Sequence, residues 1–267
     1  MVVKTFVCLA LTARGETASW DFARKVLGVL HGGDAQLCPE RAGHNESYKA
    51  RPQPFEGPDD MLPLWAPTSE RAIAGTGFSP DLYWKRSSPL RSQGSFGQTW
   101  INSVGQVIPS HARFQSDFSA DFDFVSVFRA WCALYSPTQA YLHLFTKPEV
   151  LDSSIKSGVG GGEFGLGGSW ERFRSGTFGP HRDQKTFNLG FLNYFPKDRF
   201  GSQVWDELAV SGIDPTPFGA GYLIQLAPSL QSIKDDFPGF AKRRIYAKRV
   251  MGEREFVISD EPPRKIG

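Results

Sequence analysis

The clearest pattern of hydrophobic and polar positions in this chain lies in residues 114–145. Apolar residues recur there at spacings of three and four between Phe124 and Tyr135, which predicts a helix with one buried stripe. Ser119 is a suitable N-cap, and Asp121 and Asp123 would lie in the first turn, where the helix dipole favours negative charge. Because aromatic stripes at helical spacing usually pack in a core, only the aspartates remain candidates for contact with another molecule.

The rest of the chain mixes segments typical of strands and of helices. Ser136 and Pro137 end the central helix, and the apolar run at 141–145 predicts a strand directly after it. Further strands are expected at 2–10, 81–86, 104–114, 186–195, 221–227 and 255–258, and further helices at 18–30, 203–210 and 240–250. Closely spaced prolines make residues 34–67 loop-like.

This order of elements predicts an α+β (mixed α/β) fold. We expect a central, largely antiparallel sheet with helices packed on it. A chain of 267 residues can bury a large core, so we expect one domain over residues 1–267. Residues 1–110 and 111–267 are candidates for two similar lobes.

The composition limits the classes of protein to consider. Hydrophobic residues make up 40% of the chain and charged residues 22%, which is ordinary for a globular protein. No segment approaches the roughly 18 consecutive apolar residues of a membrane span. The three cysteines are odd in number and two of them fall in apolar patterns, which indicates buried thiols in a reducing compartment. We therefore expect a cytoplasmic protein that does not enter a membrane.

The net charge of +2 is unevenly distributed. Eight basic and four acidic residues lie in residues 242–265, whereas residues 114–128 contain three aspartates and no base. The basic stretch at 242–249 suits the exposed face of a helix near its negative end, although a nucleic-acid binder often carries such a stripe. A nucleic-acid-binding domain that uses this stretch is therefore one alternative. Because the net charge of the chain is positive, we do not expect the protein to mimic DNA through its overall charge.

Motifs that suggest enzymatic chemistry lack their required context. Residues 181–188 have the spacing of a protein-kinase catalytic loop, but the upstream glycine hairpin and the Ala-Pro-Glu motif of a kinase are missing. The glycines at 160–165 have the spacing of a dinucleotide-binding motif. That motif requires a helix directly after it, and here more glycines follow instead. The five histidines lack metal-ligand spacing. We therefore assign no catalytic residue, cofactor or metal, and we keep an enzyme that uses His181 and Asp183 beside the glycine-rich loop as an alternative.

Several short segments, taken in order, carry a resemblance to a known family. They are Phe128-Arg129-Ala130-Trp131, Tyr135-Ser136-Pro137, the strand at 140–144, the glycine, bulky, leucine, x, tyrosine pattern within 189–195, the strand at 221–226, and a closing helix with Ala241 and Arg244. This series resembles the immunity protein 52 family of bacterial polymorphic toxin systems. Residues 34–67 and 158–168 look like insertions relative to that family.

The resemblance implies a protein that binds and neutralises a toxin delivered between bacteria by a contact-dependent system such as type VI secretion. Cognate toxins of the family include nucleases with a restriction-endonuclease-like domain, so we expect stoichiometric protein–protein contact and no direct binding of nucleic acid. Acidic residues could pair with the basic surface around a nuclease active site, and aromatic residues in loops could serve as buried anchors. The candidate contact residues are Asp117, Asp121, Asp123, Trp65, Phe164 and Trp170.

Overall fold

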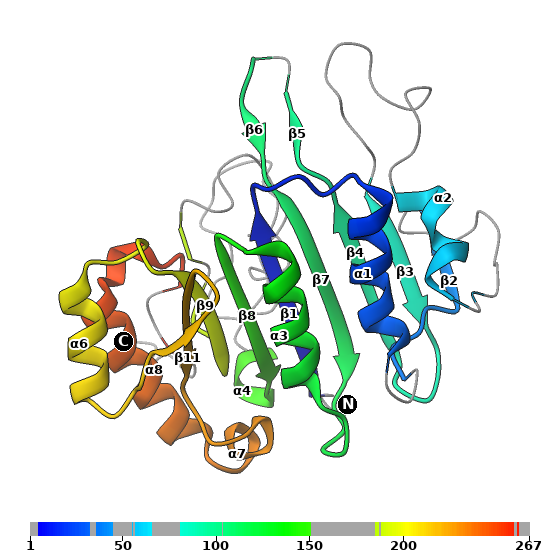
Figure 1. Cartoon of the computed structure of the whole chain (residues 1–267). Coiled ribbons are helices and arrows are strands. Elements are labelled where there is room, and N and C mark those ends of the chain that lie inside the picture. The colour runs from blue at the N-terminus through cyan, green and yellow to red at the C-terminus, as the bar shows by residue number, and fades with distance from the viewer. Residues whose placement is uncertain are drawn as a thin grey trace, which may run out of the picture.

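The computed structural model describes residues 5–32, 36–44, 55, 57–65, 81–102, 104–150, 185–186, 188–258 and 261. Nine strands form one antiparallel sheet on which helices pack (Figure 1), and this confirms the predicted α+β class. Across the sheet the strands are β10 (Thr216–Phe218), β11 (Gly221–Gln225), β9 (Leu192–Pro196), β8 (Gln139–Phe145), β1 (Phe6–Ala13), β7 (Ser110–Asp117), β4 (Ser92–Gly97), β3 (Leu82–Arg86) and β2 (Arg41–Gly43). The division into two lobes stays a prediction.

The helices are α1 (Trp20–His31), α2 (Leu62–Trp65), α3 (Phe124–Tyr135), α4 (Lys147–Val150), α6 (Ser202–Val210), α7 (Leu230–Asp235) and α8 (Phe237–Met251). Two short 3₁₀ helices, η1 (Pro58–Met61) and η3 (Glu253–Glu255), and a separate hairpin of β5 (Trp100–Ile101) and β6 (Val107–Ile108) complete the described elements. Within the described part of the chain, no helix is long and apolar enough to cross a membrane.

Strand β1 lies at the centre of the sheet, and all eight of its residues are buried. It pairs with β7 on one side and with β8 on the other, so that Leu9 lies opposite both Phe114 and Leu142. Its side chains alternate between two apolar clusters. An uninterrupted apolar run is what a strand covered on both faces requires.

Helices α1 and α3 lie side by side on one face of the sheet (Figure 1) and close the main core. Trp131 of α3 is fully buried between the rings of Phe96 and Phe114, whose centroids lie 5.4 and 5.6 Å away. Its indole nitrogen donates a hydrogen bond to the carbonyl of Val26 in α1, at 3.2 Å. One side chain therefore connects both helices to the sheet, and the predicted aromatic stripe is indeed core.

The structure corrects several predicted boundaries. The strand expected at 104–114 divides at Pro109 into β6 and β7, and β7 continues to Asp117. Residues 34–67, expected as a loop, contain β2, η1 and α2. Residues 255–258 do not add a strand to the sheet: they form the end of η3 and an isolated bridge between Phe256 and Thr186. Sequence patterns miss such short elements because their burial depends on distant neighbours.

Candidate functional site

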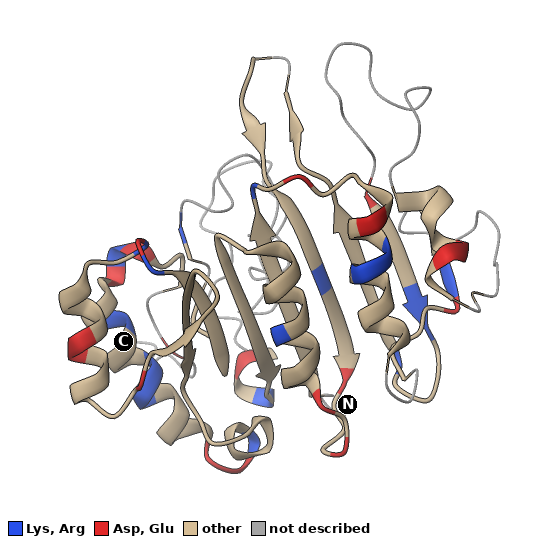
Figure 2. Cartoon of the chain, viewed as in Figure 1, with Lys and Arg blue, Asp and Glu red and all other residues tan. Residues whose placement is uncertain are grey.

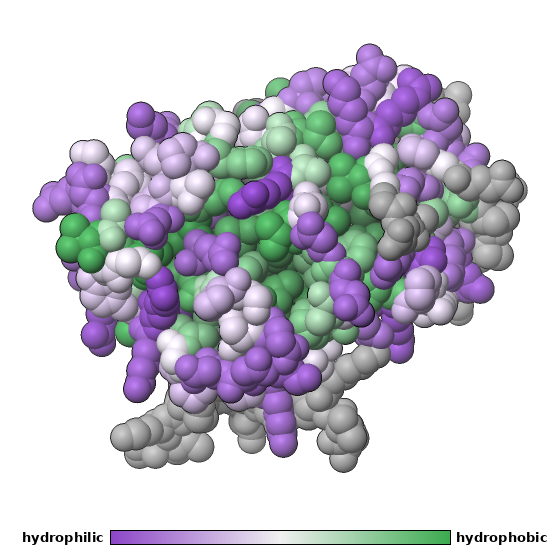
Figure 3. Space-filling view, turned by 60° about the horizontal axis from the view of Figure 1, so that its bottom comes forward, coloured by the Kyte–Doolittle hydropathy of each residue, from purple (hydrophilic) through white to green (hydrophobic). Residues whose placement is uncertain are grey.

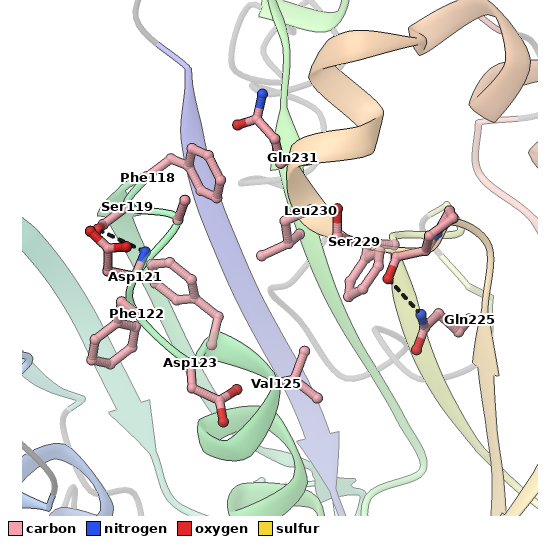
Figure 4. Close-up of a pocket in the computed structure, with 14 residues that line it drawn as sticks. Phe118, Ser119, Asp121, Phe122, Asp123, Val125, Gln225, Ser229, Leu230 and Gln231 are labelled. Atoms are coloured by element: carbon pink, nitrogen blue, oxygen red, sulfur yellow. Dashed lines mark hydrogen bonds between the residues drawn. The ribbon is translucent and has the colours of Figure 1, made fainter.

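A groove opens at one end of the sheet, where β7 leads into α3 and β11 leads into α7 (Figure 4). It encloses about 380 Å³. One wall consists of residues 118–125 and the other of Gln225, Pro228, Ser229, Leu230 and Gln231, with Phe191 also lining the space. Figure 3, in which this end of the molecule comes forward, shows hydrophobic side chains gathered in a hollow between hydrophilic ones.

Local hydrogen bonds fix the first wall. The Ser119 hydroxyl accepts a hydrogen bond from the Asp121 amide at 3.3 Å, which closes the turn after β7. The Phe122 and Phe124 rings meet edge to face with centroids 4.7 Å apart. This ring contact holds the aromatic side chains of the turn in place even when no partner is bound.

The second wall is held in the same way. The Gln225 side-chain amide donates to the carbonyls of Ala227 and Pro228, at 2.8 and 3.3 Å. Ser229 caps α7, because its hydroxyl accepts from the Ser232 amide and its own amide donates to the Ser232 hydroxyl, each at 3.1 Å. Since both walls are set by internal bonds, the groove exists before a partner arrives.

The three aspartates predicted as contact residues have different roles. Asp121 is exposed on the wall of the groove. Asp123 is the N-cap of α3: its carboxylate accepts from the Ser126 amide at 3.0 Å and from the Ser126 hydroxyl at 2.5 Å. These hydrogen bonds lower the pKa of Asp123. Asp117 lies at the end of β7 in a separate pocket of about 260 Å³, together with Lys85 and Arg91.

The N-cap of α3 therefore differs from the prediction. The helix begins at Phe124 with Asp123 as its cap, whereas Ser119 supports the preceding turn. Both residues are good capping types, and the sequence does not show which one the chain geometry selects. As a result, Asp121 lies in the turn before the helix and not in its first turn.

The predicted aromatic anchors do not gather at this groove. Trp65 is 1% exposed, its ring packs against Phe96 at 5.1 Å, and its indole nitrogen donates to the Thr17 carbonyl at 2.8 Å. It belongs to the core and is not accessible to a partner. Phe164 and Trp170 lie outside the described residues, as do His181 and Asp183 of the enzyme alternative. Of the aromatic residues that line the groove, Phe118 and Phe122 precede the periodic helix pattern, so the sequence pattern assigns them no role.

The predicted basic face of α8 is only partly exposed. Lys242, Arg243 and Arg249 are exposed, but Arg244 and Lys248 are buried, with 1% and 0% exposure. The reason is that Arg244 pairs with Glu149 and Glu261, and Lys248 pairs with Glu261. This interrupts the basic stripe and weakens the nucleic-acid alternative.

The buried charges form one network that joins β8, α4, α8 and the segment after η3. Arg244 contacts Glu149 at 3.0 Å and also pairs with Glu261, which accepts a hydrogen bond from Lys248 at 2.6 Å. His143 approaches both oxygens of Glu149, at 2.9 and 3.0 Å. Burial alone would raise the pKa of Glu149, but the charges of His143 and Arg244 and the hydrogen bonds that the carboxylate accepts bring it down to about 2. A carboxylate so firmly ionised and so fully enclosed is suited to holding elements together and unsuited to carrying protons at neutral pH.

A serine, a histidine and an aspartate also meet on the face of the sheet opposite α1 and α3, which is the face that carries His143. The Nε2 atom of His111 lies 3.3 Å from the Ser95 hydroxyl and 3.4 Å from an Asp81 carboxylate oxygen. A catalytic triad needs the hydroxyl and the carboxylate on opposite ring nitrogens, whereas here both approach the same one. Arg113 moreover donates to the Ser95 hydroxyl at 2.8 Å. The described residues also include no group of three or more side chains placed to hold a metal ion.

Comparisons with known proteins add a relationship of fold. No protein-family model matches the chain, and no curated protein matches it. A solved structure of the Pseudomonas aeruginosa T6SS protein PA0821 is similar, with a TM-score of 0.53 and 9% sequence identity, over 92% of this chain and 72% of that one. At this identity the similarity concerns the fold alone, so the chain shares its fold with a T6SS protein and its membership of the immunity protein 52 family is not confirmed.

The capping geometry predicts that Asp121 and Asp123 differ in their effect on stability. Asp123→Ala should lower the free energy of unfolding by about 1 kcal/mol, because α3 loses its N-cap. Asp121→Ala, at an exposed position, should change it by less than about 0.5 kcal/mol. Urea unfolding followed by circular dichroism measures both. Equal losses in the two variants would contradict the assignment of Asp123 as the cap.

The buried network predicts a specific dependence on pH. The pKa of Glu149 lies near 2 in the folded protein instead of at the ordinary 4.5, so its charge stabilises the fold above pH 4.5 and this contribution is lost as the pH falls toward 2. The free energy of unfolding of wild type should exceed that of Glu149→Gln by on the order of 3 kcal/mol at pH 7, and the difference should shrink below pH 4.5. Glu207→Gln, on the exposed side of α6, is the control. A difference that is the same at pH 7 and pH 3 would exclude this role.

Proposed function

We propose that this protein binds a secreted bacterial toxin and neutralises it by stoichiometric contact, in the manner of a type VI immunity protein. The preformed groove between the β7–α3 turn and the β11–α7 turn carries this proposal. A hollow that exposes aromatic and aliphatic side chains, with charged residues beside it, is typical of a surface that another protein covers.

The fold supports the same proposal. The chain shares its architecture with a T6SS protein, and short segments of its sequence resemble an immunity family. Fold alone does not define function, so the groove and its charges must supply the chemical part of the inference. The nucleic-acid alternative has less support, because the buried Arg244 and Lys248 interrupt the basic face of α8. The enzyme alternative rests on His181 and Asp183, which lie outside the described residues, and the described Ser95, His111 and Asp81 are not arranged as a triad.

The acidic charge of the groove fits a nuclease as the toxin. Both charged residues that line it, Asp121 and Asp123, are acidic (Figure 2 shows the acidic turn between β7 and α3). A nuclease, including one with a restriction-endonuclease-like domain, presents basic residues around its active site to hold phosphate. Complementary charge would speed the encounter of the two proteins and help to orient them. We place this encounter in the cytoplasm of the cell that makes the inhibitor.

The proposal predicts that the protein protects cells from the toxin encoded beside its own gene. Co-expression should restore growth of cells that produce this toxin, and the two purified proteins should elute together in size-exclusion chromatography at a fixed stoichiometry. An unrelated secreted nuclease is the control and should neither co-elute nor be neutralised. Failure of both rescue and co-elution with the neighbouring toxin would overturn the proposal.

A further inference from the structure

We infer that the groove receives a segment of the partner in which an apolar side chain is flanked by a lysine or an arginine. This inference rests on the proposed function and adds the chemistry of the contact. The apolar side chain would insert between Phe118 and Leu230, and the cation would pair with Asp121.

The apolar part of the contact follows from the side chains that face the groove. Phe118 on one wall and Leu230 on the other point toward the space between them (Figure 4), and Val125 reaches into it from the first turn of α3. Phe118 and Val125 are only partly buried, although both pack against the main core. An inserted apolar side chain would therefore extend an existing core and remove exposed apolar surface from water.

The charged part follows from the separate roles of the acids. Asp123 is committed to α3, because Ser126 occupies both of its carboxylate oxygens. Asp121 is exposed, and within the described part of the chain no hydrogen bond or ion pair engages its carboxylate. A partner can therefore pair with Asp121 without disturbing the fold.

The combination favours one class of occupant. The lining contains two aspartates and no lysine or arginine, so phosphates of a nucleic acid would meet only negative charge. A protein segment with an apolar side chain and a neighbouring cation satisfies both features of the groove. Since internal hydrogen bonds hold both walls, little ordering is needed on binding.

Binding kinetics with the neighbouring toxin test the inference. Asp121→Lys should slow association by about tenfold at low salt and reduce its salt dependence, because a rim charge acts mainly on the encounter. Phe118→Ala should speed dissociation by about tenfold or more, because it removes a buried contact. Asp206→Lys, an equal change of charge on the exposed side of α6, is the matched control and should behave as wild type.

The outcomes separate this inference from the proposed function. A wild-type complex whose rates are unchanged by Asp121→Lys would overturn the groove as the contact while leaving neutralisation in place. If Phe118→Ala unfolds more easily than wild type, Asp121→Lys decides alone, since its exposed site spares the core. Absence of any wild-type complex would overturn both proposals. Self-association of the wild type that Asp121→Lys abolishes would show that a second copy fills the groove, which also contradicts the inference.

Discussion

The pairing of β1 with β7 and β8 is the constraint on which the rest of the molecule depends. Because β1 is antiparallel to both neighbours, β7 and β8 run in the same direction, and two further antiparallel pairings give β11 that direction as well. Strands that run in parallel end at the same edge of a sheet. The turns after β7 and after β11 therefore lie at one end of the sheet, and they form the two walls of the groove.

The buried ion network has a different part in this architecture. It joins His143 of β8 to α4 and α8, and it fixes α8 through Arg244 and Lys248. Helix α8 follows α7 almost directly, so the network also helps to determine where α7 and its leading residue Leu230 lie. Buried pairs add little net stability, but an unpaired buried charge is costly, and this favours a single arrangement of the elements.

The sequence predicts local features well and distant ones poorly. Apolar spacing places most of the residues that α3 buries, because that period depends only on neighbours within one helix, but it selects Val125 where the structure buries Val127. It does not distinguish Ser119 from Asp123 as the cap, since both satisfy the local rule. It cannot place Leu230 opposite Phe118, which requires the order of strands across the sheet. The burial of Arg244 is equally hidden, because Glu149 lies 95 residues before it and becomes its neighbour only in the folded chain.

The central claim is that the groove between the β7–α3 and β11–α7 turns is the surface that meets the partner. Hydrogen–deuterium exchange of the protein alone and in complex with the neighbouring toxin measures this directly. Backbone amides of residues 118–125 and 226–231 should exchange more slowly in the complex, because a partner segment seated in the groove covers both walls. Slower exchange confined to other elements, such as α6 or the β5–β6 hairpin, with both walls unchanged, would contradict the claim.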